Sequence, residues 1–144
     1  MAIKDSIFIK TKSLLKELTY EKGGNAWYLS FDNDVAFSLY TMWRLFKNDS
    51  VLLISNDHQH QFGLPKPEDL VSDLKEIISD NLLKEIQIER NTGDLVLIFD
   101  KNVKLVAYIS SMGYESYEVF VNGNQYVAQG GGDIAIFELK KYHR

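Results

Sequence analysis

The sequence contains no cysteine and no long hydrophobic run. The absence of thiols excludes a disulfide framework and thiolate metal sites, and it fits a reducing compartment. The N-terminal segment, MAIKDSIFIKTK, lacks the long apolar centre and the small-residue cleavage site of a secretory signal. No apolar run approaches the roughly 18 residues that a membrane-spanning helix needs. We therefore expect a cytoplasmic protein with no membrane partner.

Motifs that carry catalytic chemistry are also missing. The glycine-rich segment 130–133 lacks the lysine, the serine or threonine and the following helix of a phosphate-binding loop, and it precedes a strand pattern, IAIFEL. Glu115 and Glu118 lie three residues apart, so a strand directs them to opposite faces. No Ser, His and Asp arrangement has the local context of a catalytic triad. We expect no enzyme activity and no cofactor.

Two of the three histidines, His58 and His60, lie close together in the sequence. Alternate residues of a strand share a face, so both imidazoles could bind one metal ion. No third ligand with firm spacing follows beyond Asp57, and short spacings of this kind are weak motifs. A polar surface loop is the favoured interpretation, and we expect no metal site.

The composition is that of a folded protein with an acidic balance. The chain has 144 residues, of which 45% are hydrophobic and 25% are charged, and its formal net charge is −4. We therefore expect residues 1–144 to form a single domain. A negative charge argues against binding to a nucleic-acid backbone and is compatible with a basic protein partner.

Strand patterns separated by turn residues dominate the chain. Residues 26–45 predict a hairpin around the Asp-Asn-Asp turn at 32–34, because Asn and Asp tolerate left-handed backbone. Residues 94–120 predict a second hairpin followed by a third strand. The Asn-Gly pair at 122–123 is a strong signal for one more hairpin. In residues 1–20, helix and strand patterns compete, so the first element stays open.

One segment, from Pro67 to Leu82, has the periodicity of an amphipathic helix. Its apolar face includes Leu70, Leu74 and Ile78. Pro67 suits a first helical position, and the acidic residues after it meet the positive end of the helix dipole. The sequence therefore predicts an α+β fold, with mostly antiparallel β-hairpins in one or two curved sheets packed with one main helix.

Two parts of the chain resemble each other. The segment from Leu29 to Tyr40, LSFDNDVAFSLY, aligns with the segment from Leu97 to Tyr108, LIFDKNVKLVAY, at an offset of 68 residues (97 − 29 = 68). Two hairpins with similar turns can look alike by coincidence. The alternative, which we favour slightly, is that residues 26–45 and 94–120 are duplicated hairpin units.

Four acidic residues recur on the polar face of the predicted helix, namely Asp69, Asp73, Glu76 and Asp80. Like charges at helical neighbour spacing destabilise a helix locally. This local cost favours a functional interpretation, in which the four residues form an acidic strip that binds a basic partner. The alternative is a solvated face that keeps the protein soluble.

Several aromatic residues suggest other roles. Trp27, Tyr28 and Tyr40 could line a small-ligand pocket between sheet and helix. Trp43 is expected in the core, and Arg44 is expected to pair with a nearby acid.

The order of these patterns resembles that of a known class of proteins. The pieces that carry the likeness include the run YESYE at 114–118, the segment NTGDL at 91–95, and the glycine-rich turn before the last apolar strand. Over residues 26–137 the chain resembles small bacterial immunity proteins of polymorphic toxin systems, including the WapI-like proteins of Gram-positive cell-wall-associated toxins.

The resemblance implies that the chain binds and neutralises a cognate toxin domain, commonly a nuclease, inside the producing cell. Such proteins need no catalytic residues, and they often cover the toxin's active site with acidic groups. The partner would then be a basic toxin C-terminal domain, contacted by the strip of Asp69, Asp73, Glu76 and Asp80. The alternative function is that of a small-ligand-binding or regulatory β-rich module.

Overall fold

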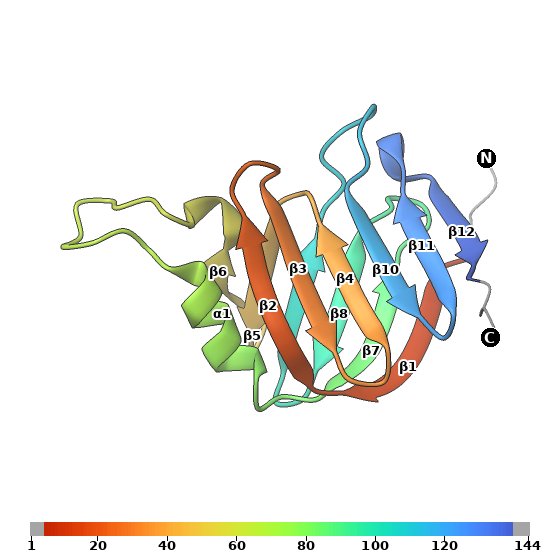
Figure 1. Cartoon of the computed structure of the whole chain (residues 1–144), viewed down its shortest axis with the longest axis horizontal. Coiled ribbons are helices and arrows are strands. Elements are labelled where there is room, and N and C mark those ends of the chain that lie inside the picture. The colour runs from red at the N-terminus through yellow and green to blue at the C-terminus, as the bar shows by residue number, and fades with distance from the viewer. Residues whose placement is uncertain (1–4, 140–144) are drawn as a thin grey trace, which may run out of the picture.

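The computed structural model describes residues 5–139, which form two six-stranded antiparallel sheets around one hydrophobic core (Figure 1). In order of pairing, sheet A contains β1(Ile7–Ser13), β7(Leu83–Ile88), β8(Leu95–Phe99), β9(Val103–Ala107), β5(Trp43–Lys47) and β6(Ser50–Ile54). Sheet B contains β12(Ile134–Glu138), β11(Asn124–Ala128), β10(Tyr117–Val121), β4(Val35–Leu39), β3(Ala26–Phe31) and β2(Leu15–Glu21). The expected α+β fold with mostly antiparallel hairpins is therefore confirmed.

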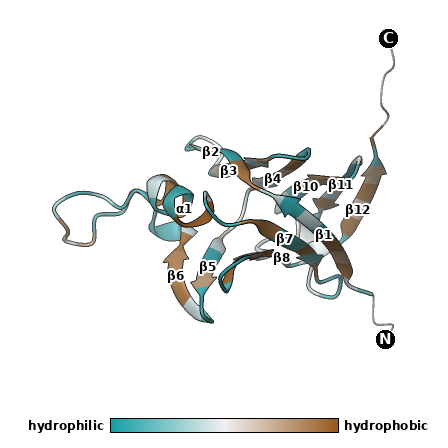
Figure 2. Ribbon diagram, turned by 90° about the horizontal axis from the view of Figure 1, so that it is seen from below, coloured by the Kyte–Doolittle hydropathy of each residue, from teal (hydrophilic) through white to brown (hydrophobic). Residues whose placement is uncertain are grey.

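The single α-helix, α1(Leu70–Ile78), covers one side of this sandwich. It lies beside the edge strands β2 and β6, while β1 and β12 lie on the opposite side (Figures 1 and 2). Leu70, Leu74 and Ile78 point inward and are almost completely buried. The helix thus completes the core where the two sheets are open to solvent. No helix in residues 5–139 has the length and apolar character needed to cross a bilayer.

The helix is shorter than the predicted segment 67–82, and side-chain caps explain both ends. At the start, Asp69 Oδ1 accepts a hydrogen bond from the backbone N–H of Ser72 at 3.1 Å, so the helix begins after Asp69. At the end, Ser79 Oγ donates to Lys75 O, and Asn81 Nδ2 donates to Ile77 O at 2.8 Å. The Asn81 side chain thereby occupies the Ile77 carbonyl group that the backbone N–H of Asn81 would use in a longer helix, and that N–H donates to Ile78 O instead.

The chain crosses from one sheet to the other between β1 and β2, between β4 and β5, and between β9 and β10. Residues 35–45, which read as one strand, form β4 in sheet B and β5 in sheet A, with a crossing at residues 40–42. Near the N-terminus, β1 and β2 are separated only by Leu14 and belong to different sheets. Of the two structures that the sequence allowed for residues 1–20, helix and strand, the described part of the segment forms strands. Residues 1–4 lie outside the described residues.

The two similar segments have the same pairing pattern. Leu29 pairs with Phe37 in the β3–β4 hairpin, and Leu97 pairs with Leu105 in the β8–β9 hairpin, so both members shift by 68 (97 − 29 = 68; 105 − 37 = 68). Each hairpin has two residues with positive φ at its turn, 33–34 and 101–102. The correspondence extends to the preceding strand, because β2–β3 and β7–β8 both contain a register shift at equivalent positions.

Candidate functional site

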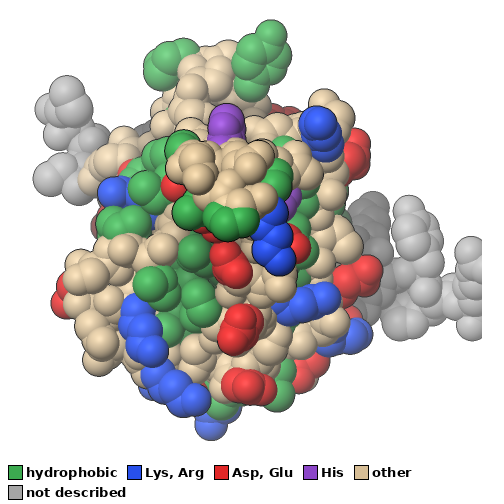
Figure 3. All heavy atoms as spheres, turned by 90° about the vertical axis from the view of Figure 1, so that its left-hand side faces the viewer, with side chains coloured by type: hydrophobic (Ala, Val, Ile, Leu, Met, Phe, Trp, Pro, Cys, Tyr) green, Lys and Arg blue, Asp and Glu red, His purple; other side chains and the backbone are tan. Residues whose placement is uncertain are grey.

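The acidic strip, defined as Asp69, Asp73, Glu76 and Asp80, lies on the outer side of α1 and just beyond its ends. Asp69 is the N-cap, and Asp80 follows the helix by two residues. Three of the four side chains are exposed, and Asp73 is half-buried. Acidic side chains are seen in a column on this face of the molecule (Figure 3). The structure therefore brings the four predicted residues onto one face.

The carboxylates of the strip take part in none of the ion pairs among the described residues. Within residues 5–139 the ion pairs join Lys10 to Glu85 and Lys84 to Asp100, both outside the strip. Asp69 accepts the capping hydrogen bond from Ser72, and this bond is made by a backbone group without formal charge. The strip is therefore a source of negative potential that is available to a cationic partner.

Two hollows flank the strip, one near each end of α1. The first has a volume of about 520 Å³ and is lined by residues 64–69 together with Ser72 and Asp73. The second has a volume of about 330 Å³ and includes Glu76 and Asp80 in its lining. Each hollow thus contains two members of the acidic strip.

A projecting loop, defined as residues 58–68, extends beyond the helix N-terminus (Figure 1). Its two arms are joined by backbone hydrogen bonds from Gln59 N to Glu68 O and from Glu68 N to His60 O, each 2.9 Å long. Near its tip, Phe62 is 65% exposed and has a positive φ of 48°. An exposed aromatic side chain on a hydrogen-bonded arm is the kind of anchor that protein interfaces use.

Phe62 was not among the contact residues predicted from the sequence, although the sequence contains a signal for it. The loop is otherwise polar and rich in turn residues, so a phenylalanine in it has no strand or helix partner to pack against. An isolated aromatic residue in such a context points to exposure and contact with a partner.

His58 and His60 do not converge on a metal site. His58 Nδ1 accepts a hydrogen bond from the backbone N–H of Leu70 at 3.1 Å, and its ring meets the Trp27 ring edge-on. The His60 ring instead stacks on Phe62. Burial lowers the pKa of His58, and the Asp69 carboxylate opposes this shift. No group of three or more His, Asp or Glu side chains in residues 5–139 could hold a metal ion.

Trp27, Tyr28 and Tyr40 do not share a pocket. Trp27 is 1% exposed and faces the core, where its ring packs edge-on against the Trp43 ring with 5.0 Å between the ring centroids. Tyr28 is the next residue of the same strand and therefore points to the outer face of sheet B. On that face, Tyr40 donates a hydrogen bond to Glu118 Oε2 at 2.8 Å, and burial together with this bond raises the pKa of Tyr40 to about 12.

Trp43 and Arg44 take different roles in β5. Trp43 is fully buried in the core, as its apolar ring predicts. Arg44 does not form the expected ion pair with an acid. Its Nη2 donates a hydrogen bond to the Tyr108 hydroxyl at 2.6 Å, and its guanidinium group lies over the Phe46 ring. Arg44 therefore packs on the outer face of sheet A and has no contact with the strip.

The glycine-rich segment forms a tight turn. In the turn Gly130–Gly132, Gly131 and Gly132 have positive φ values of 76° and 83°, and strand β12 follows it. The geometry of a phosphate-binding loop, in which a helix begins after the glycines, is not present here.

Comparison with protein-family models, with characterised proteins and with solved structures gives no match for this chain. The resemblance to immunity proteins is therefore carried only by the sequence patterns described above.

Proposed function

We propose that this chain is a bacterial immunity protein that acts in the cytoplasm of the producing cell. It binds the basic C-terminal nuclease domain of a cognate polymorphic toxin and covers the active site with its acidic strip. The observation that carries the proposal is the set of four carboxylates along one face of α1 that belong to no ion pair of the described residues, beside a projecting loop with an exposed Phe62.

The proposed contact surface has two parts, the acidic strip and the projecting loop, and each has a physical reason to bind a nuclease domain. A nuclease active site must attract phosphate groups, so its cleft is lined with cationic side chains. An acidic face is complementary to such a cleft and accelerates the encounter. The projecting loop extends from the side of the molecule where α1 lies (Figure 1), and its exposed Phe62 supplies the apolar anchor that charge alone does not provide.

The proposal expects a toxin gene immediately upstream, and the experiment combines the chain with the C-terminal domain of the protein that this gene encodes. We expect the wild-type chain to protect cells that express the toxin domain and to inhibit its nuclease activity in vitro. The variant D69N/D73N/E76Q/D80N should bind at least roughly tenfold more weakly, because it loses the charge complementarity of the interface. Rising salt should weaken wild-type binding more than binding of the variant.

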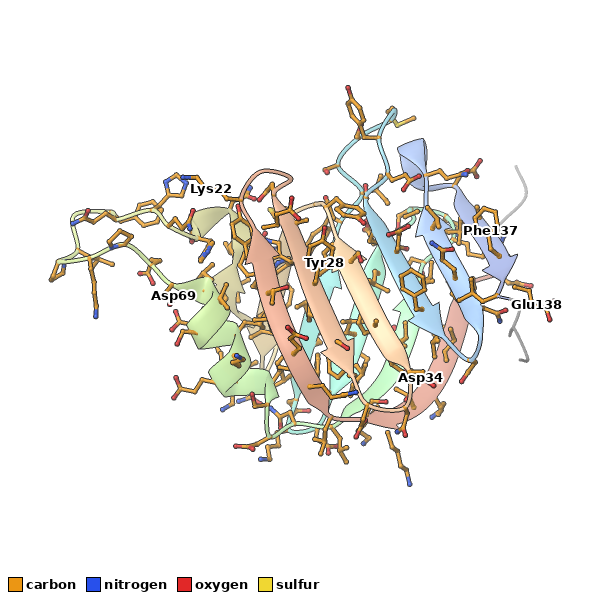
Figure 4. All side chains as sticks on the ribbon, viewed as in Figure 1. Lys22, Tyr28, Asp34, Asp69, Phe137 and Glu138 are labelled. Atoms are coloured by element: carbon orange, nitrogen blue, oxygen red, sulfur yellow. The ribbon has the colours of Figure 1, made fainter. Side chains whose placement is uncertain are left out.

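A matched control removes four charges elsewhere on the surface. Asp5, Asp34, Glu115 and Glu138 are exposed, and Figure 4 shows Asp34 and Glu138 far from Asp69. The variant D5N/D34N/E115Q/E138Q has the same net charge as the strip variant. Equal affinity of these two variants would show that net charge, and not the strip, determines binding. Undiminished growth inhibition by the toxin domain in the presence of the wild-type chain would reject the proposed function.

A further inference from the structure

The four edge strands of the sandwich differ in how they are protected from pairing with another chain. β2 and β6 lie beside α1, and β1 has the exposed lysines Lys10 and Lys12 and a register shift before Ser13. A covering helix, edge lysines and bulges are devices by which natural sheets avoid edge-to-edge association. Within residues 5–139, β12 has no α-helix beside it, contains no lysine, and pairs with β11 in unbroken register from Ile134 to Glu138.

The outer edge of β12 has backbone groups that are directed away from the sheet. Leu139 N donates to Gly123 O at 2.8 Å, so this pair of residues is hydrogen-bonded across β11 and β12. Hydrogen-bonded and non-hydrogen-bonded pairs alternate along antiparallel strands. The even-numbered residues of β12 therefore direct their N–H and C=O groups outward, namely Ile134, Ile136 and Glu138. No backbone hydrogen bond within residues 5–139 uses these outward groups.

The side chains at this edge are apolar on both faces of the strand. Ile136 is 49% exposed and lies opposite the core residue Tyr126, on the inner face of sheet B. Phe137 is 50% exposed and lies opposite Gln125, on the outer face. A further strand beside β12 would remove apolar surface from water on both faces and would bond the outward backbone groups.

We propose that β12 pairs antiparallel with β12 of a second copy of this chain, so that the two B sheets form one continuous sheet. A two-fold axis beside Ile136 places this residue opposite its equivalent, and it places Ile134 opposite Glu138 of the second copy. Because the outward residues then form the hydrogen-bonded pairs, each outward N–H meets an outward C=O. The spacing of these groups about Ile136 is thus self-complementary.

The side chains are compatible with the same register, which favours an identical strand over an unrelated one. Phe137 lies opposite Ala135 of the second copy, so a large ring meets a methyl group. Glu138 lies opposite Ile134, so the two acidic side chains are kept apart and no like charges face each other. The two Ile136 side chains bury apolar surface against each other.

The dimer leaves the acidic strips uncovered. β12 and α1 lie on opposite sides of the sandwich (Figures 1 and 2), so the strip of each copy faces away from the paired edges. The inference goes beyond the proposed function and does not depend on it, because it concerns a surface that the toxin domain does not contact in that proposal. One dimer could hold two partner molecules.

Disulfide cross-linking tests the register, because the chain has no cysteine of its own. In the proposed pair the Cα atoms of the two Ile136 residues lie about 5.5 Å apart, which a disulfide can bridge. The Cα atoms of the two Phe137 residues are diagonal neighbours about 7–8 Å apart, which is beyond that reach. Under mild oxidation, Ile136→Cys should cross-link roughly tenfold faster than Phe137→Cys. A mixture of Phe137→Cys and Ala135→Cys should form the mixed dimer readily.

Sedimentation equilibrium of the wild-type chain measures the association itself. One pair of edge strands buries little surface, so we expect a weak dimer whose population rises with protein concentration. Ile136→Lys should weaken it by at least roughly tenfold, because a lysine on an edge strand opposes pairing. Tyr28→Lys, on an inner strand of sheet B, should leave the association unchanged.

Three results would overturn the proposal: a wild-type chain that stays monomeric at millimolar concentration, equal cross-linking rates for Ile136→Cys and Phe137→Cys, or equal loss of association in Ile136→Lys and Tyr28→Lys. The proposed function would survive each of them, because the acidic strip lies on the other side of the molecule. Loss of toxin binding with a retained dimer would reject the proposed function instead.

Discussion

On one side of the sandwich the edges of the two sheets are covered by helix α1, and on the other side they are flanked by strands β1 and β12. Without these three elements, each sheet has five strands in equivalent order, β2-β3-β4-β10-β11 and β7-β8-β9-β5-β6. The pairing of β10 with β4 and that of β5 with β9 correspond as well, since Tyr117 lies opposite Leu39 and Trp43 lies opposite Ala107. The two halves therefore share one pattern of pairing and differ in what covers their edges.

The two sides of the sandwich therefore expose different kinds of side chain. The helix side has the acidic strip and a fully buried apolar face below it. The strand side has apolar residues that remain exposed on β12 and just after it, namely Ile136, Phe137 and Leu139. The shared register agrees with the hypothesis of duplicated units, which would then differ in the elements that cover their edges. The following predictions test this contrast.

The largest difference is expected in the contribution of the two sides to stability. Leu74 of α1 is completely buried, whereas Ile136 of β12 is 49% exposed. Leu74→Ala should lower the free energy of unfolding by about 2–5 kcal/mol, because it removes buried methyl groups and leaves a cavity. Ile136→Ala should cost clearly less, since its side chain already contacts water. Urea denaturation measures the free energy of unfolding of both variants. Equal losses would contradict the expected difference between the helix side and the strand side.

A second prediction concerns the turn before β12. A Cβ atom at Gly132 would lie 2.5 Å from Thr92 O, and the φ of Gly132 is +83°. Gly132→Ala should therefore destabilise the chain by about 1–3 kcal/mol through backbone strain and this clash. Gly123 has a φ of +75° but no atom within 4 Å of such a Cβ. Gly123→Ala should lower the melting temperature less than Gly132→Ala does. A larger decrease for Gly123→Ala would show that backbone strain outweighs the close contact with Thr92.

The third prediction is that the stability of the fold depends on pH through His58, which lies on the helix side. Because the folded state lowers the pKa of His58 from its ordinary value of 6.5, the unfolded state binds more protons when the pH falls through that range. The free energy of unfolding should therefore decrease as the pH drops below about 6.5. Protonation of Nδ1 also removes the acceptor for the Leu70 N–H.

Chemical denaturation at several pH values checks this dependence. The variant His58→Gln should flatten the slope, whereas His60→Gln should leave it unchanged, because the His60 ring only stacks on Phe62 in the projecting loop. An unchanged slope in His58→Gln would assign the pH dependence to other groups.

The smallest effect is expected for the free edge of β12. Phe137 is 50% exposed on this edge strand. Phe137→Lys should change the free energy of unfolding by no more than about 0.5 kcal/mol. It should reduce self-association at high protein concentration, because a lysine on an edge strand opposes edge-to-edge pairing. Light scattering measures this directly, and Tyr28→Lys, on an inner strand of sheet B, serves as the comparison.

The strand patterns were sufficient to predict the hairpins and the fold class. Alternation of apolar residues and the Asn-Gly turn at 122–123 are local signals, and both residues of that turn have positive φ. The crossing at residues 40–42 could not be predicted, because β4 and β5 continue one apolar alternation while they pair in different sheets. Long-range pairing determines that change, and no local pattern reports it.

The site could be predicted only in part. The helical spacing of Asp69, Asp73, Glu76 and Asp80 was sufficient to place these residues together, because one element carries or borders all of them. The hollow at the C-terminal end of α1 could not be predicted from the sequence, because its lining residues come from the β5–β6 hairpin, α1 and the β8–β9 hairpin, which are far apart in the chain. The alternative of a pocket lined by Trp27, Tyr28 and Tyr40 does not agree with the structure, because Trp27 and Tyr28 are neighbours on one strand and point to opposite faces of sheet B.

The crossings between sheets have a consequence for how such a chain could arise. Residues 15–54 supply three strands to one sheet and two to the other, and residues 83–128 do the same in reverse. A shorter ancestor with one such segment would leave both of its layers unfinished, and a second molecule would complete them by exchange of strands. Fusion of two copies into one polypeptide would convert that intertwined pair into a monomer and free each end to evolve its own cover.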